Sequence, residues 1–205
     1  MAGSGRYSAS MWLLLVHVAL AEGPGAFQVR VEQGAGWLHG RHVGDDRALL
    51  RGLPGSTRMA WGGLGKRGGG GVSFGAQELF WMQVRSAGET YPVKPAVSFC
   101  ADLWLHVFPS DGPWFVSSRL GARLPFVVRG KVERAVVEDF YGGALALGAG
   151  YQSPLGPKHW GWSARVELEG HRLGSFGGPQ GLDHSPRLDL LLPLATFALT
   201  WGGHR

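Results

Sequence analysis

The sequence has very little cysteine, little charge and, beyond its first residues, no long apolar run. Cys100 is the one cysteine among 205 residues, which excludes an internal disulfide framework. No later segment approaches about 18 uninterrupted apolar residues, so we predict no transmembrane helix in the mature protein. The net charge of +5 is mild and scattered along the chain, which argues against a nucleic-acid-binding protein.

Glycine and tryptophan are abundant instead, at 35 and nine residues. The glycines follow no collagen-like period and are mixed with aromatic and β-branched residues, which excludes a flexible glycine-rich linker. Together with alternating polarity, this composition indicates β-structure with many tight turns.

The N-terminal residues have the layout of a secretory signal peptide. Arg6 supplies a positive charge, and Met11–Ala21 form an apolar segment that ends in Ala-Leu-Ala, a small-x-small cleavage site. This segment is shorter than the roughly 20 residues that span a bilayer as a helix. We therefore predict a signal peptide over residues 1–21 and a single domain over residues 22–205.

The clearest pattern in the chain is the strict alternation that begins at Trp160. From there to Leu168, every second residue is apolar or small, and the residues between them include Arg165 and Glu167. A period of two indicates an extended strand with two different faces. An apolar face opposite a row of charges is typical of a membrane barrel, with lipid outside and a polar lumen inside.

Weaker alternation elsewhere brings the predicted number of strands to eight. The expected strands cover residues 26–34, 56–64, 72–85, 96–108, 114–120, 142–152, 159–171 and 188–201. Glu78, Leu79 and Trp81 break the alternation of the third strand, and a bulge near this point would account for it. In the sixth strand the residues predicted to face inward are alanine and glycine, which suits a narrow barrel.

The predicted connections alternate between long and short. We expect three external loops, Ala35–Pro54, Gly121–Tyr141 and Arg172–Pro186. An outer-membrane barrel has short periplasmic turns and longer external loops, and an even number of strands brings both ends to the periplasm.

The fold class predicted from these patterns is an all-β, closed, antiparallel up-and-down transmembrane barrel of eight strands. Closure is required because each unpaired backbone group costs several kcal/mol in hydrocarbon. Five tryptophans fall near predicted strand ends, where an aromatic girdle would lie: Trp37, Trp61, Trp114, Trp160 and Trp201. The alternative is a secreted, soluble β-sandwich with one buried face on each sheet.

The chain from the signal peptide to the last strand resembles the small outer-membrane β-barrel proteins of Gram-negative bacteria. The resemblance lies in the signal peptide, in the strands GGALALGAGYQ and HWGWSARVELEG, and in a final strand ending in Phe197, Leu199 and Trp201 at alternate positions. The last pattern is similar to the terminal signal read by the barrel-insertion machinery. No motif identifies a subfamily.

This resemblance implies a monomer in the bacterial outer membrane. The partners that it implies are outer-membrane lipid and the barrel-insertion machinery, with a further protein partner at the external loops and no nucleic acid.

Charged residues predicted to face inward form the first candidate site. Arg30 and Glu32 on the first strand would lie near Arg165 and Glu167 on the seventh, across Asp189 on the eighth. Because an eight-stranded barrel is filled by its own side chains, we interpret this set as a structural polar network. The alternative is an ion or proton path.

Three other groups of residues contain side chains that could form a chemical site. Asp183, His184 and Ser185 could form a lipid hydrolase site through a His–Ser pair, but adjacent residues followed by Pro186 favour a turn. His39 and His42 lack a third strong metal ligand. Cys100 and His106 share a strand face but would lie about 20 Å apart. We therefore predict no catalytic, cofactor-binding or metal-binding residues.

The function predicted from the sequence is a non-catalytic outer-membrane barrel that acts structurally or through its external loops. Large or charged inward groups such as Arg30, Trp104 and Arg165 should block the lumen. The alternatives are a lipid hydrolase, a soluble sandwich, and a small lipid-binding or transport barrel that opens between strands near Gly62–Gly63 or Pro193.

Overall fold

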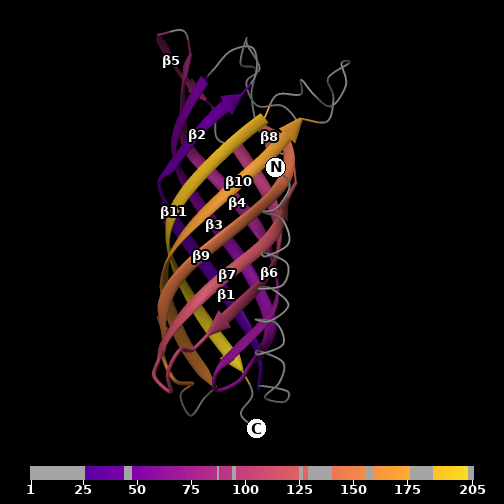
Figure 1. The fold of residues 1–205 in the computed structure, drawn as a ribbon, viewed down its shortest axis with the longest axis vertical. Helices are drawn as coiled ribbons and strands as arrows, with labels where there is room; N and C mark the ends of the chain where they lie inside the picture. The colour runs from indigo at the N-terminus through magenta and orange to yellow at the C-terminus, as the bar shows by residue number, and fades with distance from the viewer. Residues whose placement is uncertain are drawn as a thin grey trace, which may run out of the picture.

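The computed structural model describes residues 26–43, 48–86, 88–93, 96–124, 127–128, 140–155, 159–175 and 187–202. The structure has eight long strands, which wrap around one axis (Figure 1). They are β1 (Ala26–Gly36), β3 (Ala48–Leu64), β4 (Gly68–Ser86), β6 (Ala96–Val107), β7 (Trp114–Arg123), β9 (Phe140–Gln152), β10 (Trp160–Ser175) and β11 (Arg187–Gly202). Within the described residues, no helix is long and apolar enough to cross a membrane. The predicted signal peptide lies outside these residues.

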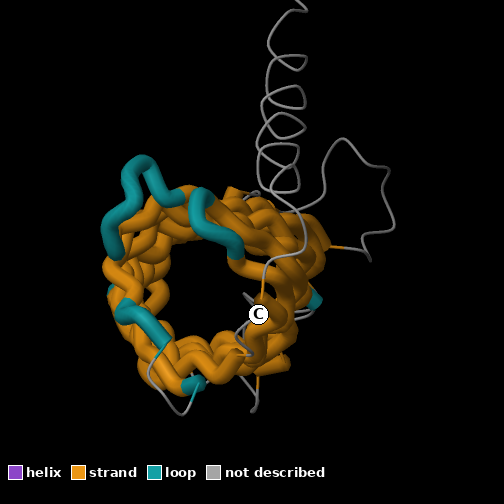
Figure 2. Tube along the Cα trace, turned by 90° about the horizontal axis from the view of Figure 1, so that it is seen from below, coloured by secondary structure: helices purple, strands orange, loops and turns teal. Residues whose placement is uncertain are grey.

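Each long strand pairs with its two neighbours in antiparallel fashion, in the order β1-β3-β4-β6-β7-β9-β10-β11. The sheet closes because β1 also pairs with β11, from Gln28 opposite Gly202 to Gly36 opposite Leu194. Viewed along the axis, the strands form a ring (Figure 2). The predicted fold class is confirmed, and the sandwich alternative is wrong because one sheet closes on itself.

Three short strands lengthen the barrel at one end. β2 (Leu38–Val43) continues β1 in the same register against β3 and β11, with only Trp37 between them. β5 (Glu89–Val93) continues the register of β6 along β4. β8 (Val127–Val128) pairs with β6 beyond the end of β7. We call the end that carries these extensions the loop end.

The opposite end, the turn end, holds the first residues of β1 and the last residues of β11 (Figure 1). Its connections lie around Lys66, Asp111 and Pro154. The first of them is closed by a hydrogen bond from the Gly65 N–H to the Gly68 carbonyl at 2.8 Å. This arrangement matches the predicted even number of strands.

The predicted loop boundaries were wrong at the loop end. Most of the expected loop Ala35–Pro54 is strand, because β1 and β2 reach Val43 and β3 begins at Ala48. The strands β7, β9 and β10 likewise extend into the expected loops Gly121–Tyr141 and Arg172–Pro186. The predicted bulge is confirmed: the β3–β4 register shifts between Leu53 and Pro54, which leaves Phe80 without a partner.

The outside of the barrel is apolar around its whole circumference. Exposed large apolar side chains lie on all eight long strands, among them Val166 at 67% exposure and Leu103 at 58%. A soluble protein rarely exposes so large a continuous apolar surface. This surface therefore faces lipid.

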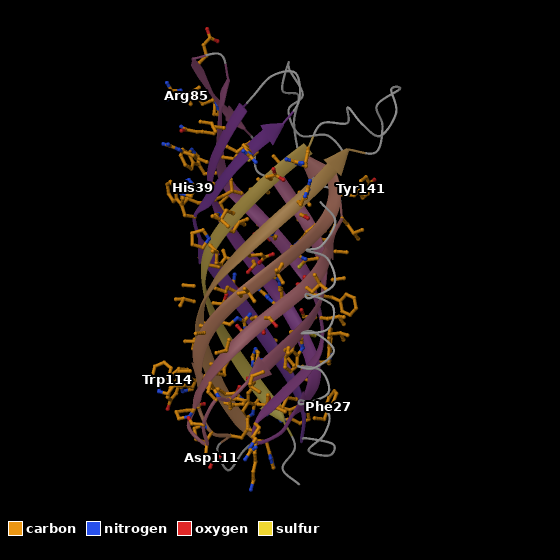
Figure 3. All side chains as sticks on the ribbon, viewed as in Figure 1. Phe27, His39, Arg85, Asp111, Trp114 and Tyr141 are labelled. Atoms are coloured by element: carbon orange, nitrogen blue, oxygen red, sulfur yellow. The ribbon has the colours of Figure 1, made fainter. Side chains whose placement is uncertain are left out.

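Aromatic side chains form a band on the outside near the turn end. Trp114, Tyr151, Trp162 and Phe197 lie in consecutive ring contacts across four strands, with centroid distances of 5.4, 5.4 and 6.2 Å. Figure 3 shows Trp114 and Phe27 at this level of the barrel. Trp160 and Trp201 are also exposed here, as expected for an interfacial girdle.

Candidate functional site

The inward side chains fill the lumen in three regions of different chemistry. Aromatic rings lie near the turn end, ion pairs occupy the middle, and leucines lie toward the loop end. Each region draws on several strands, because inward residues of neighbouring strands are placed side by side by the register.

The aromatic region is built from Trp104, His106 and Phe115. His106 stacks on Phe115 with a centroid distance of 4.3 Å and contacts the Trp104 ring at 5.1 Å. The Trp104 indole N–H lies 3.3 Å from the carbonyl oxygens of both Trp61 and Val72. All three rings are buried in the lumen near this end.

The middle of the lumen is an extended ion-pair network, which we call the charged network. Its arginines are Arg30, Arg58, Arg119, Arg123 and Arg165, and its carboxylates are Glu32, Asp102, Glu167 and Glu169. Glu32 and Arg165 form a two-point pair, with N–O distances of 2.6 and 3.1 Å. All nine side chains are buried.

Glu169 is the centre of the charged network. Its carboxylate accepts hydrogen bonds from Arg58 at 3.0 Å, from Arg119 at 3.4 Å and from Arg123. It also lies 2.8 Å from Nε2 of His171. One carboxylate thus connects β3, β7 and β10 through the interior of the barrel.

Arg30 differs from the other arginines of the charged network because its ion pair is longer. Glu32 is 3.8 Å away, while the Arg30 guanidinium lies 3.9 Å from the centre of the Trp104 ring and donates to His106 at 3.1 Å. A cation over an indole face is attracted by the ring quadrupole. Arg30 therefore joins the charged network to the aromatic region.

Small residues on β9 make room for the large inward side chains. A Cβ added at Gly150 would lie 2.6 Å from the Arg165 Cβ and 2.8 Å from the Phe115 ring, and one at Gly148 would lie 2.8 Å from the Glu167 Cβ. Ala144 and Ala146 are buried, whereas Leu145 and Leu147 are exposed. This is the orientation that the sequence predicted for β9.

The loop-end region of the lumen, which we call the leucine layer, consists of nine buried apolar residues. They are Leu38, Leu50, Leu79, Met82, Leu173, Leu188, Leu190, Leu192 and Leu194. Some outward residues beside them are polar, such as Arg51 and Arg172, and others are apolar, such as Leu49 and Leu191. At the loop end the inward face is thus apolar, where a membrane barrel ordinarily has polar inward residues.

The structure brings together four of the five residues that the sequence placed in the lumen. Arg30, Glu32, Arg165 and Glu167 all belong to the charged network. Asp189 does not: it lies at the loop end, is partly exposed, and pairs with Arg187 at 3.1 Å and Arg41 at 3.5 Å. The other members of the network were missed, although Glu169 lies on the strand whose alternation was clearest.

The other sequence candidates do not form a chemical site. Cys100 lies 3.4 Å from Arg58 Nε, while His106 contacts Arg30, so each has its own partner. Asp183, His184 and Ser185 lie outside the described residues, as does the side chain of His42. Within the described part of the chain, no three metal-ligand residues come together.

The residues of the proposed insertion signal all point outward on β11. Phe197, Leu199 and Trp201 are about half exposed, at 48%, 51% and 48%. Their recognition by the insertion machinery stays a prediction.

A closed antiparallel barrel of eight strands with an apolar exterior and a charged interior defines an integral membrane protein of the bacterial outer-membrane class. Known structures share this fold. The outer membrane protein OprG from Pseudomonas aeruginosa superposes with a TM-score of 0.55 at 12% identity, covering 89% of this chain and 98% of that one. The likeness to OprG extends to the fold alone.

Two further solved structures are similar at lower scores. Outer membrane protein AlkL in lipid bilayers has a TM-score of 0.46 at 14% identity and covers 89% of this chain and 92% of its own. Neisserial surface protein A has a TM-score of 0.43 at 12% identity and covers 85% and 97%. No protein-family model matches the sequence. No curated protein sequence matches it either.

Proposed function

We propose that this protein is a non-catalytic, non-conducting outer-membrane barrel that holds its loop-end segments at the cell surface for a structural or interaction role. The observation that carries the proposal is the filling of the lumen by buried aromatic rings, the charged network and the leucine layer. A wide aqueous channel would leave such side chains hydrated.

Planar-bilayer recording of the purified chain tests the non-conducting part of this proposal. We expect no stable openings of large conductance from the intact chain. Regular large openings would contradict the proposal.

Protease treatment of intact cells tests which end of the barrel is external. The proposal expects cleavage in the connection between β10 and β11 and protection of the turn around Lys66. Cleavage at Lys66 with protection of residues 176–186 would overturn it. Heat-modifiable gel migration of the same samples verifies that the barrel is folded.

A second candidate function is the binding of a small apolar molecule at the loop end. The observation that favours it is the leucine layer, which is apolar where a membrane barrel would ordinarily have a polar lumen. The lateral gap predicted near Gly62–Gly63 is not seen, because both residues pair with β1 and with β4. At Pro193, the carbonyl accepts a hydrogen bond from Trp37 N–H at 3.1 Å.

Titration with an apolar fluorescent probe separates the two functions. Saturable binding that Leu190→Arg abolishes, and that the outward variant Leu191→Arg leaves intact, would favour the ligand-binding barrel. The absence of saturable binding would favour the sealed barrel.

Two expectations about partners accompany the proposal. The chain should be a monomer in detergent, and it should require the barrel-insertion machinery through Phe197, Leu199 and Trp201. Slow insertion of a Trp201→Ala variant in cells, measured by heat-modifiable migration, would support the second.

The lipid hydrolase alternative has its own test. We expect unchanged lipid A in cells that produce a Ser185→Ala variant, because the proposal assigns no catalysis to Asp183, His184 and Ser185. Lipid A that is cleaved by the intact chain and spared by this variant would establish the enzyme instead.

A further inference from the structure

Arginines cluster on the outside of the barrel at the loop end. One row of directly paired outward residues runs Arg172, Asp189, Arg41, Leu49 and Arg85 across five strands. Arg51 lies on β3, two residues from Leu49 and opposite His39, and Arg187 lies on β11, two residues from Asp189. We call these five arginines the basic belt: Arg41, Arg51, Arg85, Arg172 and Arg187.

The level of the basic belt is fixed by a pair of tryptophans. Trp37 and Trp81 are exposed on the outside with ring centroids 6.3 Å apart, and Trp81 pairs with Leu53 of β3. Arg51 lies two residues beyond Leu53 toward the loop end, and Leu49, in the row of arginines, lies four residues beyond it. Exposed tryptophan rings lie at the boundary between hydrocarbon and headgroups. The basic belt therefore lies at the level of the headgroups or just beyond them.

The charge of the basic belt is mostly uncompensated. Asp189 is paired with Arg41 and Arg187. The side chains of Arg51, Arg85 and Arg172 are exposed and have no ion-pair partner among the described residues. Figure 3 shows Arg85 projecting from the barrel above His39.

We propose that the basic belt binds phosphate groups of lipid headgroups in the outer leaflet. A guanidinium presents a rigid fork of N–H donors that matches phosphate oxygens, and it binds them in two-point fashion. We propose a lipid as the ligand because these arginines lie on the outer face of the barrel. The same face contacts hydrocarbon a few residues closer to the turn end. A phosphorylated glycolipid is thereby held against β3 and β10, beside the apolar exterior.

Copurification with defined lipids tests this proposal. The folded chain is placed in vesicles that contain either diphosphoryl lipid A or the same lipid without phosphates, extracted into mild detergent, and its retained lipid is measured by native mass spectrometry. We expect retention of the phosphorylated lipid and little retention of the dephosphorylated one. A rise in salt concentration should weaken the retention because the charges are exposed.

Paired variants locate the binding to the basic belt. Arg51→Gln with Arg172→Gln should lower the retention roughly tenfold, since each arginine near a charged lipid surface adds appreciably to the affinity. Neither arginine has an acidic partner in the part of the chain that the structure describes, so their removal leaves no carboxylate there unpaired. The double lysine variant keeps the charge and should retain an intermediate amount. Lys66→Gln, at the turn end, should have no effect.

Two results would overturn the proposal. One is equal retention of the two lipids by the intact chain. The other is undiminished retention of phosphorylated lipid by the double glutamine variant, with its folding verified by heat-modifiable migration.

Discussion

The two ends of this barrel have opposite alternation. Over most of its length, apolar residues such as Val166 point outward and charged residues such as Glu167 point inward. At the loop end the order reverses, and Leu173 points inward while Arg172 is exposed. The first arrangement is typical of a strand in lipid and the second of a strand in water. The change along a single strand such as β10 therefore indicates where the bilayer ends.

The same reversal occurs on β3 and β11. Arg58 is buried and Met59 exposed in the lower part of β3, whereas Leu50 is buried and Arg51 exposed near its start. On β11, Thr196 and Thr200 are inward residues toward the turn end, whereas at the loop end Leu188 and Leu190 point inward on either side of the partly exposed Asp189. The inward face of the barrel thus changes from polar toward the turn end to apolar toward the loop end.

Loss of the central carboxylate should have the largest effect. Glu169→Gln would leave Arg58, Arg119 and Arg123 buried with one carboxylate fewer, which should lower the free energy of unfolding by about 3–5 kcal/mol. Unfolding by urea in lipid vesicles measures this free energy. The matched control at the loop end is Asp189→Asn, where a partly exposed pair contributes at most about 1 kcal/mol. Equal losses of unfolding free energy in the two variants would contradict the difference between the buried network and the loop-end ion pair.

Truncation within the leucine layer should have the next largest effect. Leu192 is fully buried, and Leu192→Ala should cost about 3 kcal/mol through lost contacts and a cavity. Its outward neighbour Leu191 is 45% exposed, so Leu191→Ala should cost far less. The same unfolding experiment compares the two. A smaller loss at Leu192 than at Leu191 would show that the leucines do not form a packed layer.

A charge placed on the outside should distinguish the two regions directly. Val166→Arg puts a cation among lipid tails and should cost about 2–4 kcal/mol if it lies near the middle of the bilayer. Leu49→Arg changes another exposed apolar residue, between Arg41 and Arg85, where the cost should be about 0–1 kcal/mol at the interface. Similar costs at both positions would mean that the bilayer extends over the basic belt.

The smallest effect concerns the reactivity of Cys100. Its side chain is buried beside Arg58, so a water-soluble thiol reagent should modify it only after unfolding. Glu169→Gln, which disturbs the same network, should increase the rate of modification in the folded state. Rapid modification of the intact chain would show that water moves freely through the charged network.

The sequence predicted the membrane region well and the loop end poorly. From Trp160 to Leu168 the two faces differ strongly in polarity, so strand and orientation could both be recognised. In residues 35–54 the outward side chains are a mixture of apolar and polar ones, such as Trp37 and Arg51, and glycine and proline interrupt the pattern, so the sequence predicted a loop. The strands there are held by pairing with β4 and β11, which no local pattern reveals.

The charged network illustrates the same limit. Arg165 and Glu167 were found because they lie on the strand with the clearest alternation. Arg58, Arg119 and Arg123 lie on strands weakened by glycines, and their partnership with Glu169 depends on the order and register of the strands around the barrel. Asp189 was predicted to face inward, but it lies on the same face of β11 as the outward residues Phe197, Leu199 and Trp201.

Spin labels along the outside of β10 test the reversal most directly. In a Cys100→Ser background, single cysteines at Val166, Leu168 and Arg172 carry the label, and accessibility to oxygen and to a water-soluble relaxant is measured in lipid vesicles. We predict that labels at 166 and 168 lie in hydrocarbon and that the label at 172 meets water and headgroups. Equal lipid exposure at all three positions, or water at 166, would contradict the account.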